Sequence, residues 1–172
     1  MKRYIITAAL VTCIGFSYGL RPSFDVNAGW QYLHISSHGA SATGNFAVIG
    51  IGTTAPYFRY MGLSASVFGI ALGEDQTSLG VAGRIGFIEM IPTKYVSPYF
   101  VQNVMLDFST SGGDSYTNLF LEGGLGIEFL TSYYVSPFIE GSFGWEHSDL
   151  FGFSLNTIGI SVRGGVKFSW IK

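Results

Sequence analysis

Charged residues and cysteine are both scarce in this sequence. Asp, Glu, Lys and Arg make up 12% of its 172 residues, whereas aromatic residues make up 16%. Ordinary soluble domains carry roughly 25% charged residues, so much of the surface is not expected to face water. The single cysteine is Cys13, close to the N-terminus. The rest of the chain therefore has no disulfide scaffold, thiolate metal site or cysteine nucleophile.

Long apolar runs and clusters of basic residues are missing as well. The longest uncharged apolar stretch covers residues 4–20, which is shorter than the roughly 20 residues that a membrane-spanning helix needs. A membrane protein without spanning helices has to be a closed β-barrel. The nine Lys and Arg residues are scattered singly apart from Lys2 and Arg3. Because no basic groove can form, the composition argues against nucleic acid as a partner.

The N-terminal segment has the pattern of an export signal. Lys2 and Arg3 form a basic start, residues 4–14 are apolar, and small residues stand at Ser17 and Gly19. These last two are the positions that a signal peptidase reads. We expect cleavage after Gly19, with Ser17 as the alternative site. The predicted division of the chain is a signal peptide, 1–19, and a barrel domain, 20–172.

After the signal, apolar residues alternate with polar or small ones from end to end. In the clearest case Leu119, Leu121 and Leu125 share one face, while Glu122 and Glu128 lie on the other. Each run has roughly the 9 to 11 residues that a tilted membrane strand requires, and no run shows a helical period. The sequence thus predicts an all-β protein, an eight-stranded antiparallel up-and-down transmembrane β-barrel. The predicted strands are 23–34, 45–54, 57–71, 78–91, 96–108, 118–130, 134–146 and 156–170.

Two of these strands have no clear inward face. Residues 45–54 carry apolar side chains in both parities. In 96–108, Gln102 interrupts whichever apolar face is chosen. The register of these two strands is therefore left open.

Longer polar or glycine-bearing connections are expected to alternate with tight turns. The longer ones are 36–43, 73–77, 110–116 and 147–153. The tight turns are 54–56, 92–94 and 131–132. Outer-membrane barrels have short periplasmic turns and longer outer loops, which predicts both termini on the periplasmic side. Tyrosines at the short-turn end indicate an interfacial aromatic girdle: Tyr57, Tyr95, Tyr133 and Tyr134.

Several segments resemble a known family. The sequence YVSPYF at 95–100 recurs as YVSPFI at 134–139. Together with GGLGIEF at 123–129 and the alternating aromatic C-terminal strand, these segments are similar to the small eight-stranded outer-membrane barrels of the opacity-protein and OmpA-barrel type. Such barrels commonly end on an aromatic residue, whereas here Ile171 and Lys172 follow the last tryptophan. The resemblance implies a surface adhesin, a structural protein or, as in a few members, an enzyme.

The patterns that suggest catalysis or cofactor binding are weak. The glycines at 123–126 lie in an alternating strand with no helix after it, so they do not form a dinucleotide loop. Outer-end histidines with serine and aspartate nearby suggest a Ser/His/acid site acting on lipid A, but two of these residues are consecutive and point to opposite faces of a continuing strand. We predict no catalytic, cofactor-binding or metal-binding residues. The residues of the Ser/His/acid pattern, to which we assign no catalytic role, are His34, His38, His147, Ser148 and Asp149.

Inward charges predict a network inside the barrel, because charges in a narrow lumen have to be paired. Counted from the short turns, four of them reach a similar mid-depth: Arg84, Glu122, Glu140 and Arg163. Asp25 and Lys167 lie nearer the periplasmic rim, on the first and last strands, and are predicted to pair where the barrel closes. Phe68, Phe120 and Phe138 also take the inward parity.

These features predict a barrel that is not an open porin, because eight strands enclose an interior that side chains can fill. The predicted function is that of a small integral outer-membrane protein with a structural or surface-interaction, adhesin-like role. It is expected to be a monomer without cofactors, in contact with outer-membrane lipid and, through short acidic loops, with host or envelope surface ligands. The alternatives are a secreted soluble barrel that binds an apolar ligand and a lipid-A-modifying outer-membrane enzyme.

Overall fold

The computed structural model describes residues 19–37, 40–72, 79–111, 114–131, 133–150 and 153–170. The predicted signal peptide lies outside these residues except for Gly19, so the division of the chain at residue 19 stays a prediction. Among the described residues, no helix is long and apolar enough to cross a membrane.

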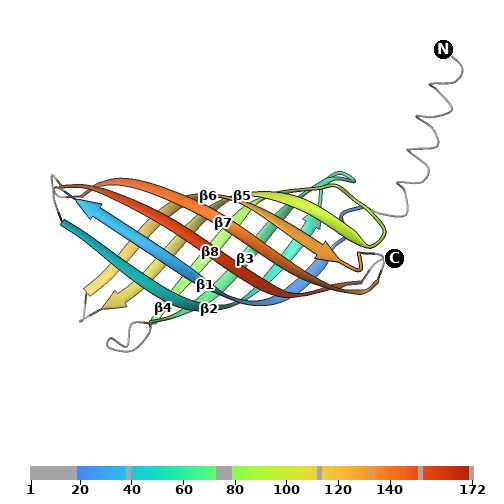
Figure 1. The fold of residues 1–172 in the computed structure, drawn as a ribbon, viewed down its shortest axis with the longest axis horizontal. Coiled ribbons are helices and arrows are strands. Elements are labelled where there is room, and N and C mark those ends of the chain that lie inside the picture. The colour runs from blue at the N-terminus through green and yellow to red at the C-terminus, as the bar shows by residue number, and fades with distance from the viewer. Residues whose placement is uncertain are drawn as a thin grey trace, which may run out of the picture.

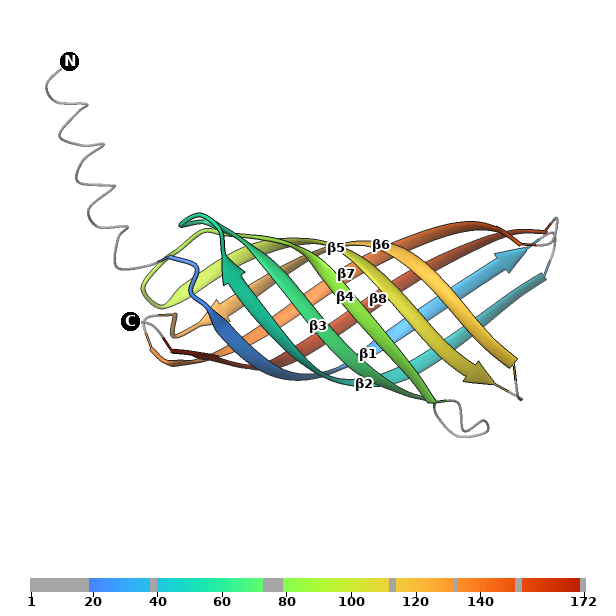
Figure 2. The ribbon, with the colours of Figure 1, turned by 180° about the vertical axis from the view of Figure 1, so that it is seen from behind.

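Eight antiparallel strands form one closed barrel (Figure 1). Each strand pairs with the next one in the chain, and β1 pairs with β8 to close the sheet. The predicted up-and-down barrel is thereby confirmed. Figure 2 shows from behind that the strands are tilted and that the chain enters and leaves at the same end of the barrel. The strands are β1 (Ser23–Ser37), β2 (Ala40–Pro56), β3 (Met61–Leu72), β4 (Leu79–Met90), β5 (Val96–Ser111), β6 (Asp114–Phe129), β7 (Val135–Leu150) and β8 (Phe153–Ser169).

The alternation in the sequence decides which side chains face outwards. Ile49, Ile85 and Leu125 lie on outward rows and expose 69%, 67% and 70% of their surface. The neighbouring residues Arg84 and Gly86 point inwards and are buried. An apolar exterior on a closed sheet is the arrangement that a bilayer requires. It is the reverse of a soluble barrel, whose charged face is the outer one, and so it counts against that alternative.

The strands run further than predicted at the end opposite the termini. The sequence predicts loops at 36–43, 110–116 and 147–153, whereas the strands continue through all of these except 38–39, 112–113 and 151–152, which lie outside the described residues. At the end near the termini, the strands are joined by 57–60, 91–95 and 130–134. The predicted contrast between longer outer loops and short turns is therefore wrong for these three connections, and the fourth predicted loop, 73–77, lies outside the described residues. Backbone pairing continues where polar residues occupy both faces and the alternation is lost. We call the two ends the hairpin end and the terminal end.

The barrel is not evenly paired at the hairpin end. The β5–β6 ladder continues to Ser111 and Asp114, and the β7–β8 ladder continues to Leu150 and Phe153. Between these hairpins, the described pairing of β6 with β7 stops at Leu121 and Trp145. The two hairpins therefore diverge beyond the closed part of the barrel, as Figure 1 shows.

Apolar side chains fill the lumen in two clusters. One lies towards the hairpin end and contains Leu33, Val48, Phe68, Ala82, Met105 and Phe120. The other lies towards the terminal end and contains Leu20, Ile88, Met90, Tyr99, Val101 and Phe138. Leu20 precedes β1 and belongs to the cluster at the terminal end. Its N–H donates to the carbonyl of Arg59 at 2.8 Å, which holds the segment in this position. The segment before the first strand thus adds to the packing of the lumen at the terminal end.

Candidate functional site

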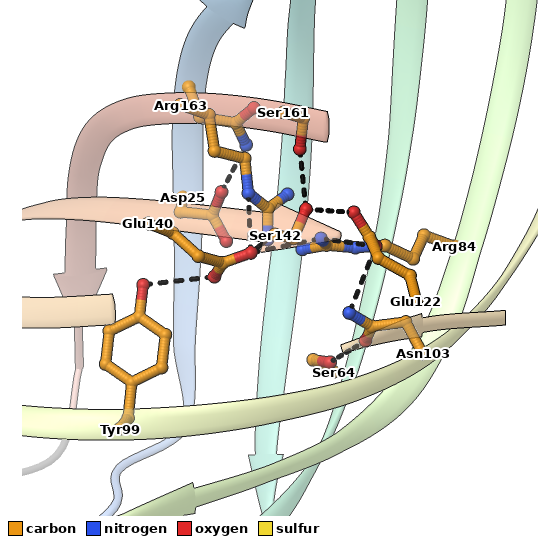
Figure 3. A network of polar contacts seen from close by, with 11 residues as sticks. Asp25, Ser64, Arg84, Tyr99, Asn103, Glu122, Glu140, Ser142, Ser161 and Arg163 are labelled. Carbon is orange, nitrogen blue, oxygen red and sulfur yellow. Dashed lines mark hydrogen bonds and ion pairs between the residues drawn. The ribbon is translucent and has the colours of Figure 1, made fainter. Parts of the chain in front are cut away.

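Four charged side chains from four strands meet between the two apolar clusters (Figure 3). Arg84 projects from β4, Glu122 from β6, Glu140 from β7 and Arg163 from β8. Their side chains expose only 3–8% of their surface. The structure therefore brings together all four residues of the predicted lumen network.

Glu140 is the centre of this network. Arg84 Nη1 bridges Glu140 Oε1 and Glu122 Oε2, with both distances 3.1 Å. Arg163 donates to the same Oε1 atom of Glu140, from Nη2 at 2.5 Å and from Nε at 3.0 Å. The hydroxyl of Tyr99 donates to Glu140 Oε2 at 3.1 Å. Two cations and a phenol thus share one carboxylate. The sequence alone does not distinguish this central position of Glu140 from the positions of the other three network residues.

Neutral polar side chains complete the network around Glu122. The amide of Asn103 donates to Glu122 Oε2 at 3.3 Å, and the Ser142 hydroxyl donates to Oε1. The Ser142 hydroxyl also lies 2.6 Å from that of Ser161 on β8. Asn103 is not predicted from the sequence, because Gln102 interrupts the alternation in β5 and the sequence does not decide which face of this strand points inwards. The serines gave no signal beyond their inward parity.

Aromatic rings pack directly against the charges. Both guanidinium groups lie over the ring of Phe68, whose centroid is 5.4 Å from Cζ of Arg84 and 5.3 Å from Cζ of Arg163. Such cation–π contacts strengthen when water is excluded. Tyr99 reaches Glu140 across β6 at Gly126, where an added Cβ would lie 2.2 Å from the ring. A glycine at this position is therefore required for the close approach of the ring.

The second predicted pair differs from the structure. Asp25 and Lys167 do face each other in the register of β1 and β8. However, Lys167 Nζ bonds Glu128 Oε2 at 2.8 Å, and Asp25 accepts a hydrogen bond from the Asn27 amide at 2.6 Å. Lys167 also lies over the ring of Tyr99, 4.7 Å from its centroid. A long cation in a narrow lumen reaches across to β6, so opposition in the ladder does not decide its partner.

The geometry of the network suits closure of the lumen better than chemistry on a substrate. Its charged groups bind one another, are buried from solvent, and lie between two apolar clusters. The outer-end residues considered for catalysis are not assembled into a site by the described chain. His34 lies opposite Ile158, His38 is outside the described residues, and the side chains at 147–149 are not described. Among the described residues no three His, Cys, Asp or Glu side chains are placed to hold a metal ion.

Comparisons with known proteins support the fold. No protein-family model and no curated protein matches the sequence. Among solved structures, the chain is similar to Neisserial surface protein A, with a TM-score of 0.62 and 16% identity over 86% of this chain and 97% of that one. It is less similar to Ail, the attachment invasion locus protein of Yersinia pestis, with a TM-score of 0.49 and 16% identity over 87% of this chain and 100% of that one. For the N-terminal barrel domain of Pseudomonas aeruginosa OprF, the TM-score is 0.47 at 10% identity, over 80% of this chain and 96% of that one.

At this level of identity, the similarity to Neisserial surface protein A shows a common fold. The closed eight-stranded sheet agrees with it. The chain is therefore a closed eight-stranded β-barrel with an apolar exterior, and it shares the fold of Neisserial surface protein A.

Proposed function

We propose that this protein is a sealed outer-membrane anchor that presents its β5–β6 and β7–β8 hairpins to partners outside the cell. The observation that carries the proposal is the charge network between two apolar clusters, from which we infer that the lumen is closed. A barrel that conducts nothing has to act through its ends. The paired hairpins project from one end only, and this end is the one we assign to the outside.

The charge of the hairpin end indicates the chemistry of the partner. No Lys or Arg occurs in 24–58, 60–83 or 95–162, which include all strand segments at that end. Of the four acidic residues of the two hairpins there, Asp107 and Glu146 are buried, which leaves Asp114 and Asp149 next to the hairpin connections. A surface with acids and no basic residues attracts cations and repels polyanions. We therefore propose a cationic surface partner, such as a basic protein segment.

Binding to immobilised polymers tests this proposal. Barrels reconstituted in neutral lipid nanodiscs should bind a polylysine surface, release it as salt is raised, and ignore a heparin surface. The variant Asp114→Asn/Asp149→Asn should bind polylysine several-fold more weakly. Glu89→Gln, which removes an exposed acid from β4 near the terminal end, is the matched control and should leave binding unchanged. Binding to heparin, or equal loss in the control, would contradict the proposal.

A further inference from the structure

Gln102 faces the membrane at the depth of the charge network. Its neighbour Asn103 points inwards and bonds Glu122 at 3.3 Å, so the exposed side chain of Gln102 points outwards. On the outward row of β5, three residues lie on each side of it. Towards the terminal end they are Phe100, Pro98 and Val96, and towards the hairpin end they are Val104, Leu106 and Phe108. The amide is therefore near the middle of the apolar band.

The surroundings of this amide are apolar on the nearest positions. In the register it lies opposite Phe87 of β4 and Gly123 of β6. The diagonal neighbours on β6 are Leu121 and Leu125, which expose 57% and 70% of their surface. A primary amide has two N–H donors and a carbonyl acceptor, and hydrocarbon offers no partner for them. The diagonal neighbours on β4 are Ile85 and Glu89, so Glu89 is the one polar group of this chain beside the amide in the register. Any other partner has to come from another molecule at the same depth.

Gly123 leaves room for that molecule. A Cβ built on Gly123 would find no atom within 4 Å, so the surface beside the amide is hollowed between the two leucines. Small residues at such positions let membrane segments approach closely, and polar side chains then hydrogen-bond between them. A shallow notch beside an unpaired amide is the combination that favours protein contact over lipid contact.

We infer that the outward face around Gln102 and Gly123 is a contact between two copies of this barrel. A second copy inserted in the same direction is related to the first by a two-fold axis along the membrane normal. This symmetry places both Gln102 side chains at one depth, where each amide N–H donates to the carbonyl oxygen of the other. The inference replaces the monomer expected from the sequence. It rests on membrane insertion alone and is independent of the cationic partner.

Cross-linking in cells tests whether the two faces meet. In a Cys13→Ser background, Val104→Cys places one thiol beside Gln102 on β5, and Ile49→Cys places one at an exposed position of β2 as a matched control. A short bis-maleimide should join the Val104→Cys barrels into dimers and leave the Ile49→Cys barrels monomeric. Equal cross-linking at both positions would show random collision and overturn the inference.

Substitution of the amide tests its role in the contact. Added to Val104→Cys, Gln102→Leu removes both hydrogen bonds of the symmetric pair and should weaken dimerisation roughly tenfold, because each such bond in a membrane is typically worth a little under threefold to tenfold. Gln102→Asn keeps the amide and should restore most of the cross-linking. Heat-modifiable migration of each variant shows that the barrel has folded. Undiminished dimers in folded Gln102→Leu, or hydrogen bonding of the amide to Glu89 on β4 in a monomeric protein, would contradict the inference without affecting the proposed function.

Discussion

Glu140 accepts hydrogen bonds from three side chains, whereas Arg163 reaches no other carboxylate in the described network. Replacement by Glu140→Gln leaves Arg163 without a carboxylate and Arg84 with Glu122 alone, and loss of one partner from such a set costs about 3–5 kcal/mol. Glu122→Gln should cost less, because Glu140 still faces both arginines. Urea unfolding in detergent micelles measures the free energy of each variant. A larger loss for Glu122→Gln would show that the centre of the network is misplaced.

The same contacts identify the pair for which a double-mutant cycle is informative. Arg163 touches Glu140 at 2.5 Å and makes no described contact with Glu122. The losses of Arg163→Met and Glu140→Gln should therefore be strongly non-additive, whereas those of Arg163→Met and Glu122→Gln should nearly add. Free energies of unfolding for the three single and two double variants decide this. Additive losses in the first cycle would mean that the two groups are not coupled.

Gly126 is needed by the ring of Tyr99, and this too can be measured. Gly126→Ala places a methyl group within 2.2 Å of the ring, which should displace the Tyr99 hydroxyl from Glu140 and cost about 1–3 kcal/mol. Gly83→Ala is the matched control, because its Cβ meets no atom within 4 Å. We expect the control to be nearly neutral in the same urea titration. If the two variants are equally stable, the ring does not depend on the glycine.

At the scale of elements, Leu20 links the chain before β1 to the apolar cluster at the terminal end of the lumen. Leu20→Ala removes a side chain that is 9% exposed among Ile88, Met90 and Phe138, and truncation of a buried leucine typically costs about 2–5 kcal/mol. The same change at Leu125, which faces lipid, should cost much less. Thermal unfolding monitored by heat-modifiable migration compares the two variants. Equal losses would indicate that the segment before β1 does not add to the packing of the lumen.

The elements also show what the sequence can and cannot predict. Period-2 alternation predicts the number of strands, and parity places Arg84, Glu140 and Phe120 inside. The alternation does not predict the structure where the two faces of a strand do not differ in polarity. At the hairpin end both faces are polar, so the sequence does not show where the strands end. The segment 57–60, with three aromatic residues, has the composition of a strand but forms a connection. The partner of Lys167 could not be predicted, because a side chain that crosses the lumen is not restricted to the adjacent strand.

For the whole molecule, three successive layers occupy the lumen: the apolar cluster towards the hairpin end, the charge network, and the apolar cluster towards the terminal end. The wild-type barrel should therefore show no steady conductance in planar bilayers. Arg84→Met disrupts the middle layer but leaves Phe120 and Phe138 buried at 1% and 6% exposure, so this variant should stay closed if it folds. Channels in Arg84→Met alone would mean that the network is the only seal. Stable channels in the wild type would remove the basis of the proposed function, because an open barrel could act through its lumen and not through its hairpins.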